Sequence, residues 1–155
     1  MNILLAEDDY LNVVILQTML EEAGYDVVVA RNGREAIACL HEREFSVILM
    51  DVKMPVLDGI AATKAIRRDS VLKEKANIPI IAVSACDGDN KDEIFAAGVD
   101  GYIEKPVDFT LLFKTIGDVV VGRKDRIIRQ LRSKIMELEA EIMELSASED
   151  EMAKV

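Results

Sequence analysis

Short apolar runs alternate with amphipathic stretches along roughly the first 120 residues of the chain. The apolar runs fall at residues 3–6, 27–30, 47–50, 80–83 and 102–103, and each has the length of a buried strand. The segments between them carry helical periodicity. This alternation predicts βαβ units around a parallel sheet, with right-handed crossovers that place helices on both faces.

The helical segments are expected to begin and end at recognisable capping residues. In the second helix, Asn32 and Glu35 form a capping box. The third helix is expected over residues 58–68, the fourth ends at Gly98, and the fifth begins near Asp108. The first helix is expected to present one apolar face, formed by Leu11, Val14, Ile15 and Met19.

The pattern changes after Gly122. Residues 123–155 contain no proline, glycine or aromatic residue, and apolar residues recur at alternating steps of three and four until Glu149. They form a heptad seam with Ile at each a position and Leu at each d position: Ile128, Leu131, Ile135, Leu138, Ile142 and Leu145. This combination favours a parallel two-stranded coiled coil, in which Lys134 at g faces Glu139 at e of a partner.

The alternative for this segment is a single amphipathic helix that folds back on its own domain. A docked helix usually shows a wider apolar stripe than this narrow seam, so we prefer the coiled coil. We therefore expect two parts, a globular domain over residues 1–120 and a dimerisation tail over residues 121–155.

Composition and charge limit the class of protein. Half of the residues are apolar and 31% are charged, which suits a globular domain with a sizeable core. A net charge of −10 disfavours binding to nucleic acids or anionic membranes. The first acidic residue is already Glu7, which does not fit a signal peptide, and no apolar run is long enough to span a bilayer. We therefore expect a cytoplasmic protein. Cys39 and Cys86 are too few for a disulfide framework and are expected to be reduced.

Polar side chains follow four of the predicted strands. The first strand is followed by Glu7, Asp8 and Asp9, the third by Asp51, the fourth by Ser84 and the fifth by Lys105. In a parallel sheet these strand ends meet at one edge. Each residue alone has an ordinary structural explanation, such as a helix cap for the aspartates. Their convergence is better explained by a shared site.

The chemistry of these side chains suits phosphoryl transfer. Crowded carboxylates need a cation, and Mg²⁺ prefers one or two carboxylates together with water and phosphate oxygens. Asp51 then acts as a nucleophile that forms an aspartyl phosphate. Lys105 and Ser84 supply a positive charge and a hydrogen bond for the phosphoryl oxygens.

Four motifs in this order resemble the receiver domain of two-component response regulators of the chemotaxis-regulator type. They are AEDD at residues 6–9, MDVKMPVLDG at 50–59, VSA at 83–85 and AAGVDGYIEKP at 96–106. The resemblance covers about residues 1–120. It implies a doubly wound, flavodoxin-like (βα)5 fold with strand order 2-1-3-4-5, extended here by a C-terminal coiled-coil helix.

The resemblance also implies a role for each matching residue. Asp51 corresponds to the phosphoacceptor, and Lys105 to the phosphate-binding lysine, whose peptide bond to Pro106 can adopt the cis form. Asp8 and Asp9 correspond to the acidic pair that holds Mg²⁺, together with Asp51 and the backbone carbonyl of Lys53.

Two further pairs of residues are implied to control the state of the domain. Ser84 and Tyr102 correspond to the switch hydroxyl and the switch aromatic, which together remodel the face formed by the fourth helix, fifth strand and fifth helix. Lys53 and Cys86 stand where family members tune the lifetime of the phosphoryl group.

The resulting hypothesis is a response regulator that accepts a phosphoryl group from a sensor histidine kinase and signals through a dimeric tail. It is not expected to be an enzyme beyond its own phosphorylation and dephosphorylation. Alternatives are a phosphorelay shuttle to a histidine phosphotransfer protein, and a receiver fragment of a longer regulator with a missing output domain.

Two other classes fit the sequence less well. A basic zipper would bind DNA, but the basic run at residues 123–134 overlaps the seam and lacks aromatic residues. A flavodoxin would need a phosphate-cradling loop after the first strand, where EDDYLN at residues 7–12 is acidic. A haloacid-dehalogenase-like enzyme would need a first-strand nucleophile with a second aspartate two residues on, and Asp8 and Asp9 lack that spacing.

Overall fold

The structure is a computed structural model that describes residues 1–85 and 90–152, with side chains as far as residue 146. A five-stranded parallel sheet in the order β2-β1-β3-β4-β5 lies at its centre, which confirms the predicted topology. The strands are β1 (Asn2–Ala6), β2 (Asp26–Ala30), β3 (Val47–Asp51), β4 (Ile80–Ala85) and β5 (Gly101–Lys105). Each lies within two residues of an apolar run in the sequence.

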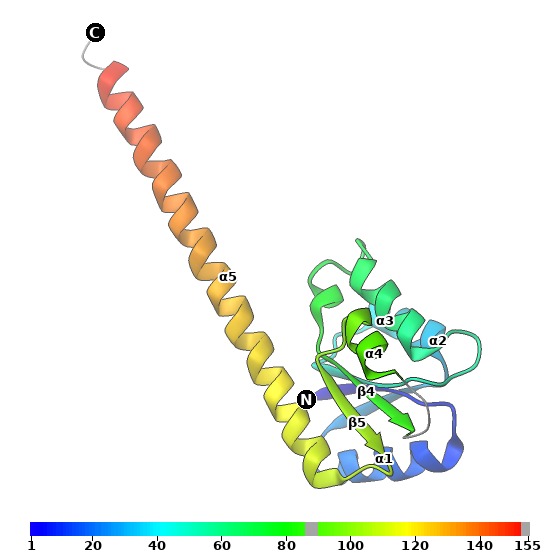
Figure 1. Cartoon of the computed structure of the whole chain (residues 1–155). Helices are drawn as coiled ribbons and strands as arrows, with labels where there is room; N and C mark the ends of the chain where they lie inside the picture. Colours follow the sequence, from blue (N-terminus) through cyan, green and yellow to red (C-terminus); the bar gives the residue numbers. More distant parts are fainter. Residues whose placement is uncertain (86–89, 153–155) are drawn as a thin grey trace. The chain divides into compact units, whose positions relative to one another are not determined.

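Helices cover both faces of this sheet (Figure 1). They are α1 (Tyr10–Glu22), α2 (Gly33–Glu42), α3 (Gly59–Arg68), the 3-10 helix η1 (Lys73–Asn77), α4 (Lys91–Ala97) and α5 (Phe109–Met152). The chain divides into two compact units, Met1–Val120 and Val121–Val155.

Because successive side chains of a strand point to opposite faces of the sheet, each face has its own hydrophobic core. In β1, Leu4 and Ala6 pack with α2 and α3, through residues such as Leu40 and Ile66. Ile3 and Leu5 point the other way, into a core built with α1 and the first turns of α5. The central strand β3 is buried along its whole length, because it is covered on both faces and paired on both edges.

The buried face of α1 differs from the predicted one. The residues that enter the core are Val13, Leu16 and Leu20, whereas Leu11, Val14 and Ile15 are exposed. The prediction was wrong because this helix is apolar on more than one side, so several series of three- and four-residue steps fit it. The helix begins after Asp9, whose side chain caps it, and the packing against the sheet then selects one series.

Capping residues were predicted more successfully. The Asn32 side chain accepts a hydrogen bond from the Glu35 amide at 2.9 Å and so begins α2. Asp58 caps α3 in the same way, through the Ala61 amide at 2.8 Å. Gly98 ends α4 in the left-handed conformation, with φ 108°, as expected for a glycine C-cap.

Arg67 of α3 joins several chain segments near the starts of β4 and β5. Its guanidinium donates to the carbonyl oxygens of Gly98, Ala76 and Ile78 at 2.6–2.9 Å. It also forms an ion pair of 2.9 Å with Asp100, which in turn accepts from the Ile80 amide. This one side chain therefore joins α3 to the ends of η1 and α4 and to the entries of β4 and β5.

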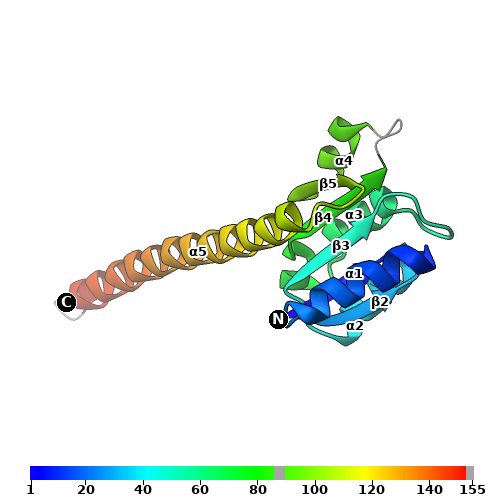
Figure 2. The ribbon, with the colours of Figure 1, turned by 90° about the horizontal axis from the view of Figure 1, so that it is seen from below.

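The second unit consists of the C-terminal part of α5. Helical structure continues through Gly117 and Gly122 to Met152, so neither glycine ends the helix. Within the described part of the chain, no helix is both long and apolar enough to cross a membrane (Figure 2 shows the helices from a second side).

Candidate functional site

Asp51 is the last residue of the buried strand β3 and carries an almost fully buried carboxylate, with 7% of its side chain exposed. One carboxylate oxygen accepts from the Lys53 amide at 3.2 Å, and the other faces the Lys105 ammonium at 3.0 Å. The loop that follows is closed by a hydrogen bond from the Gly59 amide to the carbonyl of Val52. A Cβ at Gly59 would collide with the carbonyl of Asp51, so this loop needs a glycine there.

Lys105 ends β5 and links two of the acids. Its ammonium lies 2.8 Å from Glu7 and 3.0 Å from Asp51, although the two carboxylates belong to different strand ends. The peptide bond between Lys105 and Pro106 is cis. The strand order places β1 between β2 and β3, so the ends of β1 and β3 are adjacent, and Lys105 reaches them from the edge strand.

The charges of this cluster shift its proton equilibria. Burial, and after it the charge of Glu7, raise the pKa of Asp51 from its ordinary value of 3.8 to about 6, although Lys105 opposes them. Burial lowers the pKa of Lys105, but hydrogen bonds and attraction from Glu7 and Asp51 outweigh it and hold that pKa above its ordinary value. One lysine therefore does not fully balance two buried carboxylates, and the site has room for more positive charge.

Three acids lie close enough to share a cation. Glu7, Asp8 and Asp51 each offer a carboxylate oxygen, and these oxygens lie within 4.8 Å of one another. Glu7 and Asp51 are buried, while Asp8 is exposed at the mouth of the site. An all-oxygen donor set of this kind fits Mg²⁺, which keeps some of its water ligands. The incomplete neutralisation by Lys105 is a second reason why a divalent cation fits here.

The structure gives Asp9 a different place from the one expected. Its carboxylate accepts from the Asn12 amide at 2.9 Å and caps α1, and it is not part of the acid cluster. Glu7 takes the expected place of an acid beside Asp51. Its carboxylate also accepts from the Asp9 amide at 3.0 Å, so the tight turn fixes both residues.

The sequence contained a signal for this assignment. Asp9 stands three residues before Asn12, which is the spacing of an N-cap whose side chain accepts from the third amide of a helix. This cap directs the Asp9 carboxylate toward the start of α1. Counting back from the helix start leaves Glu7 and Asp8 as the acids at the end of β1.

Ser84 and Tyr102 lie on neighbouring strands near the site. Ser84 is fully buried in β4, and its hydroxyl donates to the Ala85 carbonyl at 3.2 Å. Tyr102 of β5 is half-buried beside Ile94 and Val52. The Lys91 ammonium lies 4.7 Å from the centre of its ring, which links the start of α4 to β5 by a cation–π contact.

The two residues expected to tune the site differ in how far the structure describes them. Lys53 is exposed next to Asp51 and lines an open cleft together with Asp8, Met54 and Pro55. Cys86 lies outside the described residues. The expected role of the Lys53 carbonyl as a metal ligand stays a prediction.

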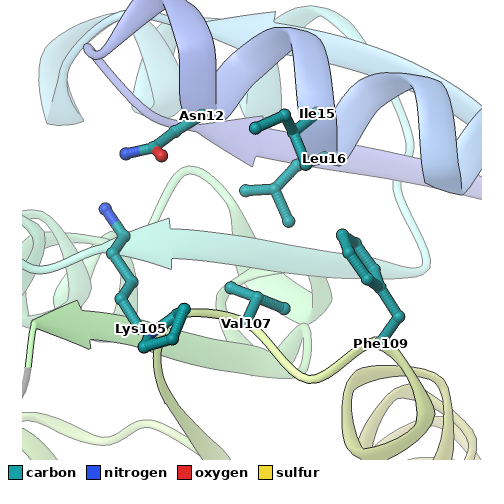
Figure 3. A pocket seen from close by; sticks show the side chains of 7 residues that line it. Asn12, Ile15, Leu16, Lys105, Val107 and Phe109 are labelled. Atoms are coloured by element: carbon teal, nitrogen blue, oxygen red, sulfur yellow. The ribbon is translucent and has the colours of Figure 1, made fainter.

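A cleft of about 280 Å³ opens beside Lys105, between α1 and the loop that follows β5. Figure 3 shows the polar side chains of Asn12 and Lys105 at one end and Ile15, Leu16, Val107 and Phe109 along the rest. The exposed side chains of Tyr10, Leu11, Val14 and Ile15 continue this apolar surface along α1.

Comparison with known proteins decides the family. A family model for the response regulator receiver domain matches residues 3–117. The chain belongs to this family. One relative is matched over almost its whole length. The protein PilH of Pseudomonas aeruginosa is 35% identical over 122 residues, which cover 77% of this chain and 98% of that protein.

Other receiver relatives are parts of much larger proteins. Hybrid signal transduction histidine kinase I of Dictyostelium discoideum is 39% identical over 121 residues, 74% of this chain and 7% of the kinase. This chain spans 7% to 14% of the length of the first such kinases that it matches.

Solved receiver domains have the same fold. One is the receiver domain of a sensor histidine kinase from Pseudomonas aeruginosa, determined with a magnesium ion in its active-site cleft. It is 32% identical, with a TM-score of 0.70 over 77% of this chain and 96% of that one. Another is the receiver domain of a Saccharomyces cerevisiae response regulator, determined together with its histidine phosphotransfer protein. It is 30% identical, with a TM-score of 0.70 over 79% of this chain and 90% of that one.

Proposed function

We propose that this receiver domain accepts a phosphoryl group on Asp51 from a phosphohistidine of a sensor histidine kinase. The observation that carries the proposal is the cluster of Asp51, Glu7, Asp8 and Lys105 at one edge of the sheet. A carboxylate oxygen of Asp51 attacks phosphorus, a P–O bond forms, and the P–N bond to the imidazole breaks. The domain acts as a phosphoacceptor and catalyses no reaction beyond its own phosphorylation and dephosphorylation.

The residues around Asp51 have separate tasks in this reaction. Lys105 faces the carboxylate oxygen at 3.0 Å, so it is placed to pair with a phosphoryl oxygen after transfer. Glu7 and Asp8, with Asp51, would hold Mg²⁺. When bound, this ion offsets the repulsion between the incoming phosphoryl group and the acids. The magnesium ion in the related Pseudomonas aeruginosa receiver supports this assignment.

A test of the reaction uses phosphoramidate, a small donor with a P–N bond, and follows the phosphoprotein on a phosphate-affinity gel. We expect labelling in Mg²⁺, little in EDTA, and a rate at least roughly tenfold lower for Lys105→Gln, because a positive charge is lost where negative charge develops. Lys114→Gln, at an exposed position that also forms an ion pair, is the matched control. Equal labelling of Lys105→Gln and wild type contradicts the proposal.

Ser84 and Tyr102 are proposed to form the conformational switch of the domain. The buried Ser84 hydroxyl is one strand away from Asp51 and is proposed to turn toward the phosphoryl group. Tyr102 is proposed to move inward, which releases its ring from Lys91 and changes the surface formed by α4, β5 and α5. Lys53 and Cys86 are proposed to set how long the phosphoryl group lasts, and a Lys53→Ala variant with an unchanged decay rate would remove Lys53 from this role.

The apolar surface of α1 is proposed as the site where the phosphohistidine protein docks. It borders the cleft at Lys105, and its apolar side chains are exposed. An Ile15→Asp variant should lose phosphoryl transfer from a histidine protein and keep its reaction with phosphoramidate. Loss of both reactions, or of neither, argues against docking at this surface.

The tail is proposed to form a dimeric coiled coil through the seam that begins at Ile128. Phosphorylation is proposed to change this association, because α5 contributes both to the switch surface and to the seam. Sedimentation with and without beryllofluoride, which mimics the phosphoryl group, tests this link. Identical association constants and unchanged cross-linking of the tail would contradict it.

A phosphorelay shuttle is the second candidate function. The Saccharomyces cerevisiae receiver that resembles this chain was determined with a histidine phosphotransfer protein, which favours this alternative. In a shuttle, Asp51 passes its phosphoryl group on to a histidine. Phosphorylated protein mixed with a histidine phosphotransfer protein should then lose its label to that protein, whereas a terminal regulator keeps it until hydrolysis. A receiver cut from a longer regulator is a third candidate, consistent with the much longer kinase relatives.

A further inference from the structure

The C-terminal part of α5 presents an apolar seam that is exposed in the described part of a single chain. The seam side chains from Ile128 to Leu145 are each 45% to 66% exposed. Their spacing places them along one line of the helix, at the a and d positions of a heptad. A second copy of the same seam would bury this line, as proposed above. The apolar residues by themselves favour parallel helices, but the charges along the helix also bear on the orientation.

Charge is distributed unevenly along the same helix. The positive residues lie in its first half, and they are Arg123, Lys124, Arg126, Arg129, Arg132 and Lys134. The negative residues dominate its second half, and they include Glu137, Glu139, Glu141 and Glu144. Two parallel copies place like charges side by side, whereas two antiparallel copies place each positive half against a negative half.

The positions that flank the seam sharpen this difference. In a parallel pair, Lys134 at g meets Glu139 at e of the second copy, and this is the one attractive g–e pair, because Arg132 meets Ile127 and Glu141 meets Ser146. In an antiparallel pair, e meets e and g meets g. With Ile135 level with Leu138 of the second copy, Arg132 meets Glu139 and Lys134 meets Glu141, and each pair occurs twice by symmetry.

Charged residues at the ends of the seam also distinguish the two orientations. By sequence, Lys124 takes the d position before Ile128, and Glu149 takes the a position after Leu145. A parallel pair brings Lys124 against Lys124 within the seam. The antiparallel alignment that matches Ile128 with Leu145 separates these two lysines along the helix axis.

We propose that two copies of the tail associate in antiparallel orientation, with Ile128, Leu131 and Ile135 of one copy opposite Leu145, Ile142 and Leu138 of the other. The inference rests on the self-association proposed above and specifies its orientation. Ile at a with Leu at d is the combination found in parallel dimers, and it argues for the other orientation. The antiparallel alignment keeps all apolar layers, doubles the attractive flanking pairs and removes the like-charge contact inside the seam.

Disulfide trapping reads the orientation directly. Both native cysteines are first replaced, as Cys39→Ala and Cys86→Ala, and Ile128→Cys and Leu145→Cys are then made in separate chains. In the antiparallel pair, the two copies of position 128 lie about 25 Å apart along the axis, so neither protein cross-links alone. An oxidised mixture of the two should give a mixed dimer. Cross-links within each single population, and none specific to the mixture, would overturn the proposal.

Charge reversal gives a second, independent readout. In an antiparallel dimer, Arg132→Glu sets a carboxylate at position 132 against Glu139 twice and should raise the dimer dissociation constant about tenfold, whereas in a parallel dimer it has no charged partner. Adding Glu139→Arg should restore association if the copies are antiparallel, and weaken it if they are parallel, because Lys134 then faces an arginine. Arg129→Glu is the matched control, since Arg129 stands at b and its side chain contacts the Asp125 carbonyl of its own helix.

The outcomes separate this inference from the proposal on which it rests. A protein that stays monomeric in sedimentation at high micromolar concentration defeats tail self-association altogether. A dimer that cross-links at position 128 to position 128 keeps self-association and overturns the antiparallel orientation. A dimer with mixed cross-links, weakened by Arg132→Glu and restored by Glu139→Arg, supports both.

Discussion

Replacing the phosphoacceptor is expected to stabilise the metal-free protein. Asp51 is buried beside Glu7, and the Lys105 ammonium pairs with both carboxylates. An amide in place of the Asp51 carboxylate keeps a similar shape and removes the buried negative charge. The Asp51→Asn variant should therefore unfold at a higher temperature than wild type in EDTA, although it loses the group at the centre of the proposed function.

The shift in the Asp51 pKa gives the size of this effect. Each tenfold change in an acid constant corresponds to ~1.4 kcal/mol, so a rise from 3.8 to about 6 corresponds to about 3 kcal/mol at neutral pH. Relaxation around the charge reduces this figure, and we expect a gain of roughly 1–3 kcal/mol. For a unit of this size, that gain corresponds to an increase in Tm of roughly 4–10 °C.

The sign of the pH dependence follows from the same shift. A raised pKa means that the folded state holds a proton on Asp51 more tightly than the unfolded state does. The destabilisation of the folded state by the charged Asp51 carboxylate is therefore complete above about pH 6 and decreases as the pH falls toward 3.8. The stability difference between Asp51→Asn and wild type should shrink between pH 7 and pH 5.

Thermal unfolding in EDTA and in Mg²⁺ tests these statements. Wild type should gain stability from Mg²⁺, and Asp51→Asn should gain much less, because a ligand of the proposed site is lost. Asp118→Asn removes the same charge from an exposed side chain and should change stability by less than about 0.5 kcal/mol. An Asp51→Asn protein that is less stable than wild type in EDTA at pH 7 refutes the argument from uncompensated charge.

Three further substitutions probe the site and its support. Glu7→Gln should lower the Asp51 pKa, because it removes a repelling charge, and should weaken Mg²⁺ binding roughly tenfold in a fluorescence or calorimetric titration. Asp9→Ala should cost about 1 kcal/mol of stability through the lost cap of α1 and leave Mg²⁺ affinity within about twofold, so a large loss of affinity would return Asp9 to the metal site. Arg67→Ala should cost roughly 2–4 kcal/mol in urea unfolding, because three carbonyl oxygens and Asp100 lose their donor, and a change below about 1 kcal/mol would contradict that role.

The fold was predictable because its strands are continuous apolar runs. A parallel sheet with both faces covered needs such runs, and each strand lies within two residues of one. The capping residues Asn32 and Asp58 and the terminating Gly98 fixed several helix ends, since each has a local chemical reason. The strand ends then brought Asp51 and Lys105 together as expected.

Two features were less accessible from the sequence. The buried face of α1 was predicted wrongly because the helix is apolar on several sides. Only its packing against the sheet selects the face that carries Val13 and Leu16. The position of Glu7 depends on a turn that uses Asp9 as a cap, which spacing indicated but the acidic motif obscured. Both are cases in which tertiary contacts choose among local patterns of similar quality.

Self-association raises a different difficulty, because a single chain does not contain the contact. The seam from Ile128 to Leu145 is exposed in the single chain and predicts a partner helix, and its apolar positions face one another in either orientation. The orientation depends on the order of charges along α5, and in particular on where Arg132 and Lys134 stand relative to Glu139 and Glu141.

The most direct test of the central claim is the mass of the intact protein after incubation with acetyl phosphate. In Mg²⁺, wild type should gain one phosphoryl group, which hydroxylamine removes because an acyl phosphate is cleaved by this nucleophile. Asp51→Asn, and wild type in EDTA, should gain little or none. A phosphoryl adduct on Asp51→Asn equal to that of wild type would contradict the assignment of Asp51 as the phosphoacceptor.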